Sequence, residues 1–184
     1  DLGSRRSRDV LQKAYAQMDR QTDAAMGAAL RKPLPPPPAP LKRGTLWPLQ
    51  DGRVTQEFGP SNFYLSPPRN WQGKHYAHFH SGLDIAAPKG TPIAAYDGGK
   101  VFSAGPLGAC GMSVVIVHPD QVASTYCHMD QGARGPTVRA GQWVNAGDTI
   151  GYVGMTGLTT GPHTHFITKK GEIFNPRTVL PKLK

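Results

Sequence analysis

The chain has 184 residues, of which 38% are apolar and 18% charged, and its formal net charge is +9. No stretch approaches the roughly 18 consecutive apolar residues that a membrane-spanning helix needs, and the 22 glycines and 18 prolines argue against a helical bundle, because both residues disfavour helix interiors. The positive charge favours contact with a polyanion, but no helix-turn-helix, finger or aromatic-interleaved basic stretch points to nucleic acid.

The first segment, residues 1–32, predicts a basic arm with an amphipathic helix over about residues 7–31. An isolated helix is marginal in water, so its apolar stripe needs a partner surface. That partner can be the following domain, a second copy or another protein, and the sequence leaves these three open. The stripe recurs at spacings of three and four and consists of Val10, Leu11, Ala14, Tyr15, Met18, Ala25, Met26, Ala29 and Leu30.

A proline-rich linker over residues 33–44 follows the arm. Residues 33–40 hold six prolines in eight positions, which predicts a stiff polyproline II spacer. Residues 1–44 carry nine Lys and Arg against four Asp and Glu, so they are the more densely cationic part of the chain. We expect any protein partner to attach through these residues.

Residues 45–184 consist of short apolar runs broken by Gly and Pro, which predicts an all-β domain. Residues 113–117 and 122–126 flank a polar turn and predict an antiparallel hairpin. The expected strands are Thr91–Tyr96, Lys100–Ser103, Ser113–His118, Val122–Cys127, Gln142–Val144, Thr149–Val153 and Thr164–Thr168.

Two features of this domain leave alternatives open. A long Gly-, Pro- and Asn-rich loop from Gly59 to Tyr76 carries Tyr64, Trp71 and Tyr76, which either wall a cleft or cover the edge of the core. Cys110 and Cys127 flank the hairpin at neighbouring cross-strand positions, where a disulfide is feasible but not required.

The chemistry of the sequence lies in its seven histidines, all of which follow residue 74. His163 and His165 fall in an expected strand, where residues two apart share one face at about 6–7 Å between Cα atoms. One imidazole can then hold a metal while its neighbour meets a substrate.

His80 and Asp84 add an imidazole and a carboxylate four residues apart. An extended chain would separate them by roughly 13 Å, so the chain must bend, and we expect Gly82 to provide the bend through a positive φ. Asp84 begins an apolar stretch, where a carboxylate needs a cation or hydrogen-bond donors.

The remaining histidines allow other interpretations. A rival ligand set of His75, His78 and His80 is conceivable, but it leaves Asp84 and His165 unexplained. His118 lies in the predicted hairpin turn, and we expect it on the solvated surface.

Five stretches of the domain resemble the lysostaphin-type (LytM-like) zinc endopeptidases of bacterial cell walls. The resemblance runs from about Trp47 to Pro181 and does not include residues 1–44. The stretches are His80–Asp84, Gly90–Ile93, Tyr126–Met129, Val144–Gly151 and Gly157–Phe166.

This resemblance implies a compact antiparallel β-sheet with a cleft on its face, preceded here by the helix and the polyproline linker. It implies that His80, Asp84 and His165 bind one Zn²⁺ and that His128 and His163 are catalytic. Two imidazoles and one carboxylate leave a fourth zinc position open, which suits hydrolysis. The sequence does not divide the general-base and oxyanion-stabilising roles between His128 and His163.

The implied activity is hydrolysis of peptide crosslinks or bridges of peptidoglycan, outside the cytoplasm or in a virion. The alternative is a structural component of a larger assembly, such as a phage tail or injection apparatus, that carries this domain as a local wall-degrading tool. A zinc-free, wall-binding regulator is disfavoured because all five site positions are filled. The sequence does not indicate the bond cleaved, the wall type, the oligomeric state or a host or phage origin.

Overall fold

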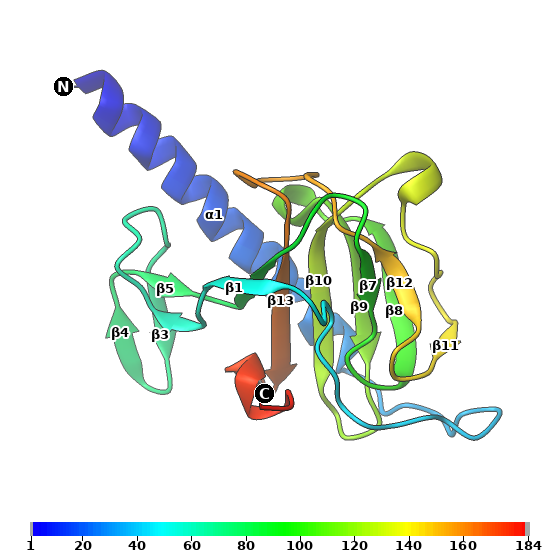
Figure 1. Ribbon diagram of the computed structural model, residues 1–184. Helices are drawn as coiled ribbons and strands as arrows, with labels where there is room; N and C mark the ends of the chain where they lie inside the picture. The colour runs from blue at the N-terminus through cyan, green and yellow to red at the C-terminus, as the bar shows by residue number, and fades with distance from the viewer. Residues whose placement is uncertain (1, 183–184) are drawn as a thin grey trace.

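The computed structural model describes residues 2–182, which form one long helix followed by a β-rich body (Figure 1). Helix α1 spans Leu2–Ala29. Neither α1 nor any shorter helix within residues 2–182 combines the length and apolar character that crossing a membrane requires. The strands are β1 (Arg53–Gln56), β2 (Gly59–Pro60), β3 (Arg69–Trp71), β4 (Lys74–Tyr76), β5 (Phe79–His80), β6 (Leu83–Ala86), β7 (Pro92–Ala94), β8 (Gly99–Pro106), β9 (Met112–Val117), β10 (Ala123–Met129), β11 (Trp143–Val144), β12 (Thr149–Tyr152), β13 (His163–Lys170) and β14 (Glu172–Phe174), with short 3₁₀-helices η1 (Gly108–Cys110), η2 (Gly132–Arg134) and η3 (Pro176–Thr178).

Eight strands form one antiparallel sheet in the order β1-β6-β13-β10-β9-β8-β11, with β14 paired to β13. This arrangement confirms the prediction of an all-β domain, and the predicted hairpin is present as β9 and β10. The register places Asp84 of β6 opposite His165 of β13, and His165 opposite Cys127 of β10. Directly opposed residues lie on the same face of a sheet, so these three side chains share one face.

The other face of the sheet carries the main hydrophobic core. Tyr126 and Phe166 are fully buried on this face, and their ring centroids lie 5.2 Å apart. Strands β7 and β12 pair in a separate two-stranded sheet and add Ile93 and Ile150 to the same core. Burial of apolar surface stabilises by roughly 25 cal/mol per Å², so this closed face contributes much of the stability.

Helix α1 covers part of the face that bears Asp84 and His165. Met18 and Met26 belong to one buried cluster with Val115 of β9 and Ile167 of β13. The part of the predicted stripe from Tyr15 to Leu30 therefore packs on the domain of its own chain. Val10, nearer the N-terminus, is 66% exposed, and the first turns of α1 extend beyond the sheet in Figure 1. The helix also begins at residue 2 rather than near residue 7 and ends at residue 29 rather than 31.

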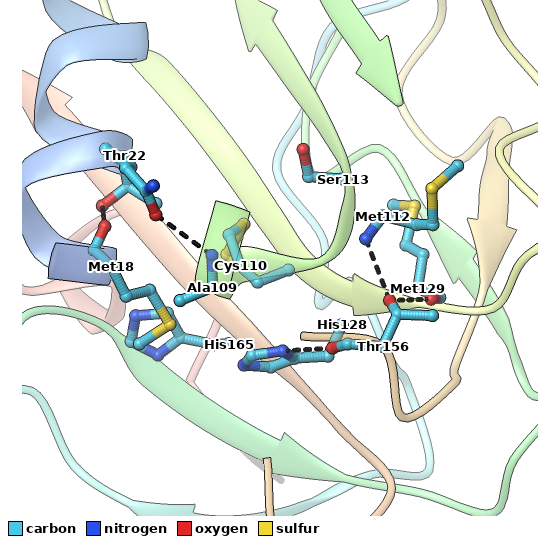
Figure 2. Close-up of a disulfide and its surroundings, with 12 residues drawn as sticks. Met18, Thr22, Ala109, Cys110, Met112, Ser113, His128, Met129, Thr156 and His165 are labelled. Atoms are coloured by element: carbon cyan, nitrogen blue, oxygen red, sulfur yellow. Dashed lines mark hydrogen bonds between the residues drawn. A yellow bond between two sulfur atoms is a disulfide. The ribbon is translucent and has the colours of Figure 1, made fainter. Parts of the chain in front are cut away.

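A disulfide joins Cys110 to Cys127, and both residues are fully buried. Cys110 lies in η1 rather than in a strand, and the two Cα atoms are 4.8 Å apart. Figure 2 shows Met18 of α1 and His128 of β10 close to this bridge. Because Cys127 directly precedes His128, the bridge holds the strand that carries this histidine.

The linker after α1 forms no helix or strand across residues 33–46. Its far end is attached to the body of the protein. Lys42 N donates to Asn145 Oδ1 at 2.8 Å, and the Arg43 guanidinium donates to both carboxylate oxygens of Asp97 at 3.0 and 2.9 Å. These contacts make the segment a strap along the domain, and its polyproline II conformation stays a prediction.

His118 is fully buried, so its expected place on the solvated surface was wrong. Its Nδ1 lies 2.8 Å from the carbonyl oxygen of Gly98, and its Nε2 lies 2.8 Å from Ser124 Oγ. Burial lowers the pKa of His118 to about 4, so the ring is neutral at pH 7. The turn position alone did not reveal that the ring folds inward onto Gly98.

The segment from Gly59 to Tyr76 contains β2, β3 and β4 rather than one continuous loop. Gln72 and Gly73 have φ values of 49° and 75°, which suit a two-residue hairpin turn between β3 and β4. Trp71 and Tyr76 pack on Phe79, with ring centroids 5.4 and 5.5 Å away. These two aromatic residues therefore cover the edge of the core and do not wall a cleft.

Candidate metal centre

The neighbouring strands β6 and β13 bring a carboxylate and two imidazoles together. Asp84 Oδ1 lies 2.8 Å from Nδ1 of His165, the residue opposite it in the sheet. His163 precedes His165 by two residues and lies on the same face, with its Nε2 3.6 Å from Asp84 Oδ1. The strand periodicity that predicted a shared pocket for the two histidines is thus realised.

His80 reaches the same carboxylate from the end of β5, with its Nε2 3.3 Å from Asp84 Oδ2. The chain breaks between β5 and β6 at Ser81 and Gly82, as the spacing required. Gly82, however, does not have the positive φ that we expected. A Cβ at this position would lie 2.6 Å from the carbonyl oxygen of Phe166 and 2.9 Å from Cε1 of His165. Gly82 is needed because the two strands approach closely.

His80, Asp84 and His165 each offer one ligand atom, and these atoms all lie within 4.8 Å of one another. The rival set is not assembled: His75 Nδ1 contacts Asn70 Oδ1 at 2.7 Å, and His78 Nδ1 contacts the carbonyl oxygen of Ser66 at 2.8 Å. Within residues 2–182, no other three His, Cys, Asp or Glu side chains bring their ligand atoms together as a metal site requires.

The second nitrogen of each clustered imidazole has its own partner. His80 Nδ1 lies 3.0 Å from the carbonyl oxygen of Glu57. A carbonyl only accepts, so Nδ1 carries a proton and Nε2 is the nitrogen that faces Asp84. His165 Nε2 lies 3.3 Å from Ser81 Oγ, which leaves Nδ1 facing Asp84. Two oriented imidazoles and one carboxylate are the donors that zinc prefers, so these residues fit a zinc ion.

His128 and His163 stand beside the cluster, with ring centroids 4.8 Å apart. His163 Nδ1 lies 2.9 Å from the carbonyl oxygen of Gly161, and His128 Nδ1 lies 2.9 Å from that of Thr156 (Figure 2). Both rings therefore donate through Nδ1 to the backbone, which leaves the lone pair of each Nε2 free.

A backbone irregularity sets the orientation of His128. Its φ is 65°, rare for a residue other than glycine, and the pairing of β10 with β9 shifts register between Tyr126 and Met129. Such bulges redirect a side chain next to a functional site. The Thr156 hydroxyl donates to the carbonyl oxygen of Met129 and accepts from the N–H of Met112, which fixes the segment that holds His128 (Figure 2).

The surrounding groups keep the Asp84 carboxylate ionised and the His128 ring neutral. Burial opposes ionisation of Asp84, but His80 and His165 outweigh it and hold the pKa of this carboxyl well below its usual range. Burial, with the adjacent His163 and His165, lowers the pKa of His128 to about 3. At neutral pH, the His128 ring is therefore neutral.

These residues line a cleft of about 780 Å³ on the face of the sheet. Helix α1 forms part of its wall through Tyr15, Met18 and Asp19, and Phe63 lies near Tyr15 at 6.2 Å between ring centroids. Tyr64, which the sequence suggested as a wall, is 56% exposed and does not line the cleft.

Sequence reasoning missed the helix wall and the backbone groups that orient the imidazoles. The carbonyl groups of Glu57, Thr156 and Gly161 leave no trace in residue type, because any residue supplies a carbonyl. The helix residues did carry a signal, since Tyr15 and Met18 belong to the predicted apolar stripe, but the stripe did not indicate which surface it covers.

The fold and the cluster together define a β-sheet protein with a metal-binding donor set in a face cleft. The chain belongs to peptidase family M23, whose pattern matches residues 78–176, a range that contains all five predicted site residues. The curated relative DD-carboxypeptidase/endopeptidase Mpg of Neisseria meningitidis is 35% identical over 140 residues, covering 71% of this chain and 31% of the relative. The chain thus spans about a third of the length of this relative.

Two solved structures have the same fold. A putative M23 peptidase from Pseudomonas aeruginosa is 29% identical with a TM-score of 0.64, and the match covers 92% of this chain and 63% of that one. A zinc-containing peptidase from Vibrio cholerae is 26% identical with a TM-score of 0.60, covering 78% of this chain and 41% of that one. Residues 45–184 are about three quarters of the chain, so the Pseudomonas match extends into residues 1–44.

Proposed function

We propose that this chain is a zinc-dependent endopeptidase that hydrolyses peptide crosslinks or bridges of bacterial peptidoglycan. The observation that carries the proposal is the group of His80, Asp84 and His165 in a cleft that also holds two oriented imidazoles. Membership of family M23 supports peptide hydrolysis. The name of another curated relative, peptidoglycan DD-endopeptidase ShyC of Vibrio cholerae, supports the choice of substrate; it is 36% identical over 133 residues, covering 72% of this chain and 28% of the relative.

In this proposal, His80 Nε2, one oxygen of Asp84 and His165 Nδ1 hold one zinc ion. When bound, zinc supplies a Lewis acid that polarises the scissile carbonyl and lowers the pKa of a water molecule towards about 7. The hydrogen bonds from His80 to Glu57 and from His165 to Ser81 keep both rings in the required orientation.

His128 and His163 carry the proton transfers. The free Nε2 of one ring accepts a proton from the attacking water, and the other ring stabilises the developing oxyanion or protonates the leaving amine. The backbone carbonyls of Thr156 and Gly161 hold Nδ1–H on each ring, so both rings present the same tautomer to the cleft. The proposal does not divide the two roles between the rings.

Peptidoglycan lies outside the cytoplasm, so we place the action of this chain in the periplasm, the cell wall or the medium. The Cys110–Cys127 disulfide supports this location, because such bridges persist in oxidising compartments. The comparisons do not support the virion location or the alternative role in a phage tail or injection apparatus. That alternative also assigned residues 1–44 to a partner, whereas Met18 and Met26 pack on the chain's own domain.

The test is digestion of purified peptidoglycan by the full chain, before and after a chelator, with identification of the released muropeptides. We expect the chelator to abolish hydrolysis and stoichiometric Zn²⁺ to restore it. Mg²⁺ is the matched control, since it prefers oxygen ligands and should not restore activity. A protein that binds zinc but releases no muropeptide, or hydrolyses equally well with the chelator, would refute the proposal.

A further inference from the structure

A hydrogen-bonded chain of three side chains connects helix α1 to the metal centre. Ser81 Oγ donates to Asp19 Oδ1 at 2.8 Å, and the same Oγ lies 3.3 Å from His165 Nε2. Asp19 is on α1, Ser81 lies between β5 and β6, and His165 is on β13. All three residues are buried, with exposed fractions of 8%, 3% and 1%.

The direction of the hydrogen bonds follows from the number of protons available. An ionised carboxylate only accepts, so the single hydroxyl proton of Ser81 forms the hydrogen bond to Asp19. Ser81 Oγ is then left to accept, and His165 Nε2 must carry the proton that it accepts. In a neutral ring, Nδ1, which lies 2.8 Å from Asp84 Oδ1, is then the nitrogen that would offer its lone pair to a bound metal.

A neighbouring cation favours the ionised form of Asp19. Arg69 Nη2 lies 3.8 Å from Asp19 Oδ2 and 2.8 Å from Asp23 Oδ2, so a positive charge stands beside the buried carboxylate. Burial raises the pKa of Asp19 above its ordinary value, and Arg69 and the hydrogen bond from Ser81 limit this rise. Met18 and Met26 pack this part of α1 on the sheet, which holds the carboxylate over Ser81.

We propose that Asp19 is a positioning residue for the metal centre, which acts through Ser81 to hold His165 in the tautomer and orientation that bind zinc. The inference rests on the proposed function for the identity of the metal. It makes α1 part of the functional site rather than an arm beside it. Removing an outer partner of this kind typically costs about 10- to 100-fold in metal affinity.

The experiment measures zinc affinity by competition with a chelator on the full chain, for the native sequence, Asp19→Ala, Ser81→Ala and the double variant. We expect about 10- to 100-fold weaker binding for each single variant. The double variant should be no weaker than the worse single variant, because both act in one chain of hydrogen bonds. Asp19→Asn retains an oxygen that can accept from Ser81, so it should lose less affinity than Asp19→Ala.

Asp23→Ala is the matched control, because Asp23 lies on the same helix and contacts the same Arg69 without touching Ser81. We expect its zinc affinity to equal that of the native sequence. The unfolding temperature of each metal-free variant separates a loss of zinc binding from a loss of folding. Unchanged affinity in Asp19→Ala, or an equal loss in Asp23→Ala, would overturn the inference and leave the proposed function intact. A native chain that binds no zinc would overturn both.

Discussion

The two faces of the central sheet are built for different tasks. One face packs Tyr126 and Phe166 against β7 and β12 and is closed by apolar side chains. The other face carries Asp84 and His165, and α1 covers only part of it. Alternation along β6, β10 and β13 assigns neighbouring residues to opposite faces, so the same strands serve both tasks.

This difference shows how one sheet can hold polar groups rigidly without a thick protein layer over them. The closed face fixes the strands, and the strands then fix the spacing of Asp84, His163 and His165. The open face needs more support, because its imidazoles must be oriented and partly desolvated. Helix α1, the disulfide and backbone carbonyls supply that support on the site face.

The largest effect should come from the closed face. Phe166→Ala removes a fully buried ring that contacts Tyr96 and Tyr126, and we expect the free energy of unfolding to fall by about 3–5 kcal/mol. Denaturant unfolding of the metal-free chain measures it. A loss below about 1 kcal/mol would show that this face is not the main source of stability.

Removing the disulfide tests how much it stabilises the face of the sheet that carries the site. Replacing Cys110 and Cys127 by alanine opens a loop with a sequence separation of 17 residues, and we expect a loss of about 3 kcal/mol. Thermal unfolding measures the stability of the double variant and of the oxidised native chain. Equal stability would mean that the packing of α1 alone holds this region.

The two imidazoles outside the donor set should affect turnover rather than stability. His163→Ala or His128→Ala should each lower peptidoglycan hydrolysis by about 100-fold or more while zinc stays bound. Elemental analysis and muropeptide release give the two measurements. His75→Ala, an exposed histidine outside the cluster, is the control and should hydrolyse normally. Near-normal hydrolysis by His128→Ala would remove this residue from the mechanism.

His118 should make the closed face sensitive to acid. Its pKa is lowered to about 4 in the fold, so the unfolded chain binds a proton first as the pH falls below about 6.5. Stability linked to this group is present above pH 6.5 and is lost towards pH 4, with about 2 kcal/mol lost between pH 7 and pH 5. His118→Gln should show a pH profile of unfolding free energy that is flatter by this amount. Parallel profiles would contradict the buried neutral state.

The smallest effect should come from the surface pair of Glu57 and Arg177. Their side chains are substantially exposed and form two hydrogen bonds of 2.8 and 2.7 Å. Exposed pairs contribute about 0–1 kcal/mol, so Glu57→Gln should change stability little. Zinc affinity should also stay the same, because His80 uses the backbone carbonyl of Glu57. A large loss of zinc affinity would show that the side chain holds this segment in place.

Much of the fold was predictable because strand and helix periodicities are local properties of the sequence. The strand pattern located β9, β10 and β13, and the spacing of His163 and His165 placed both on one face. The helix pattern located α1 to within a few residues. The partner of α1 was not predictable, because an apolar stripe fits any apolar surface.

The part of the site that lay beyond prediction depends on contacts between distant segments. His80, Asp84 and His165 could be grouped from the motifs, and the structure brings the three together. The contact from Asp19 to Ser81 joins residues 62 positions apart, and no local pattern indicates it. The inward rotation of His118 and the role of Gly82 in close strand approach also depend on neighbours that only the folded chain supplies.

The position of the disulfide has a consequence for how it can be reduced. Cys110 and Cys127 have no exposed surface, and Met18 of α1 belongs to the cluster that buries them (Figure 2). A thiol reagent in solution can reach the sulfur atoms only after this region opens. The rate of reduction under native conditions therefore reports how often the region around the disulfide, which includes Met18 of α1, opens to solvent.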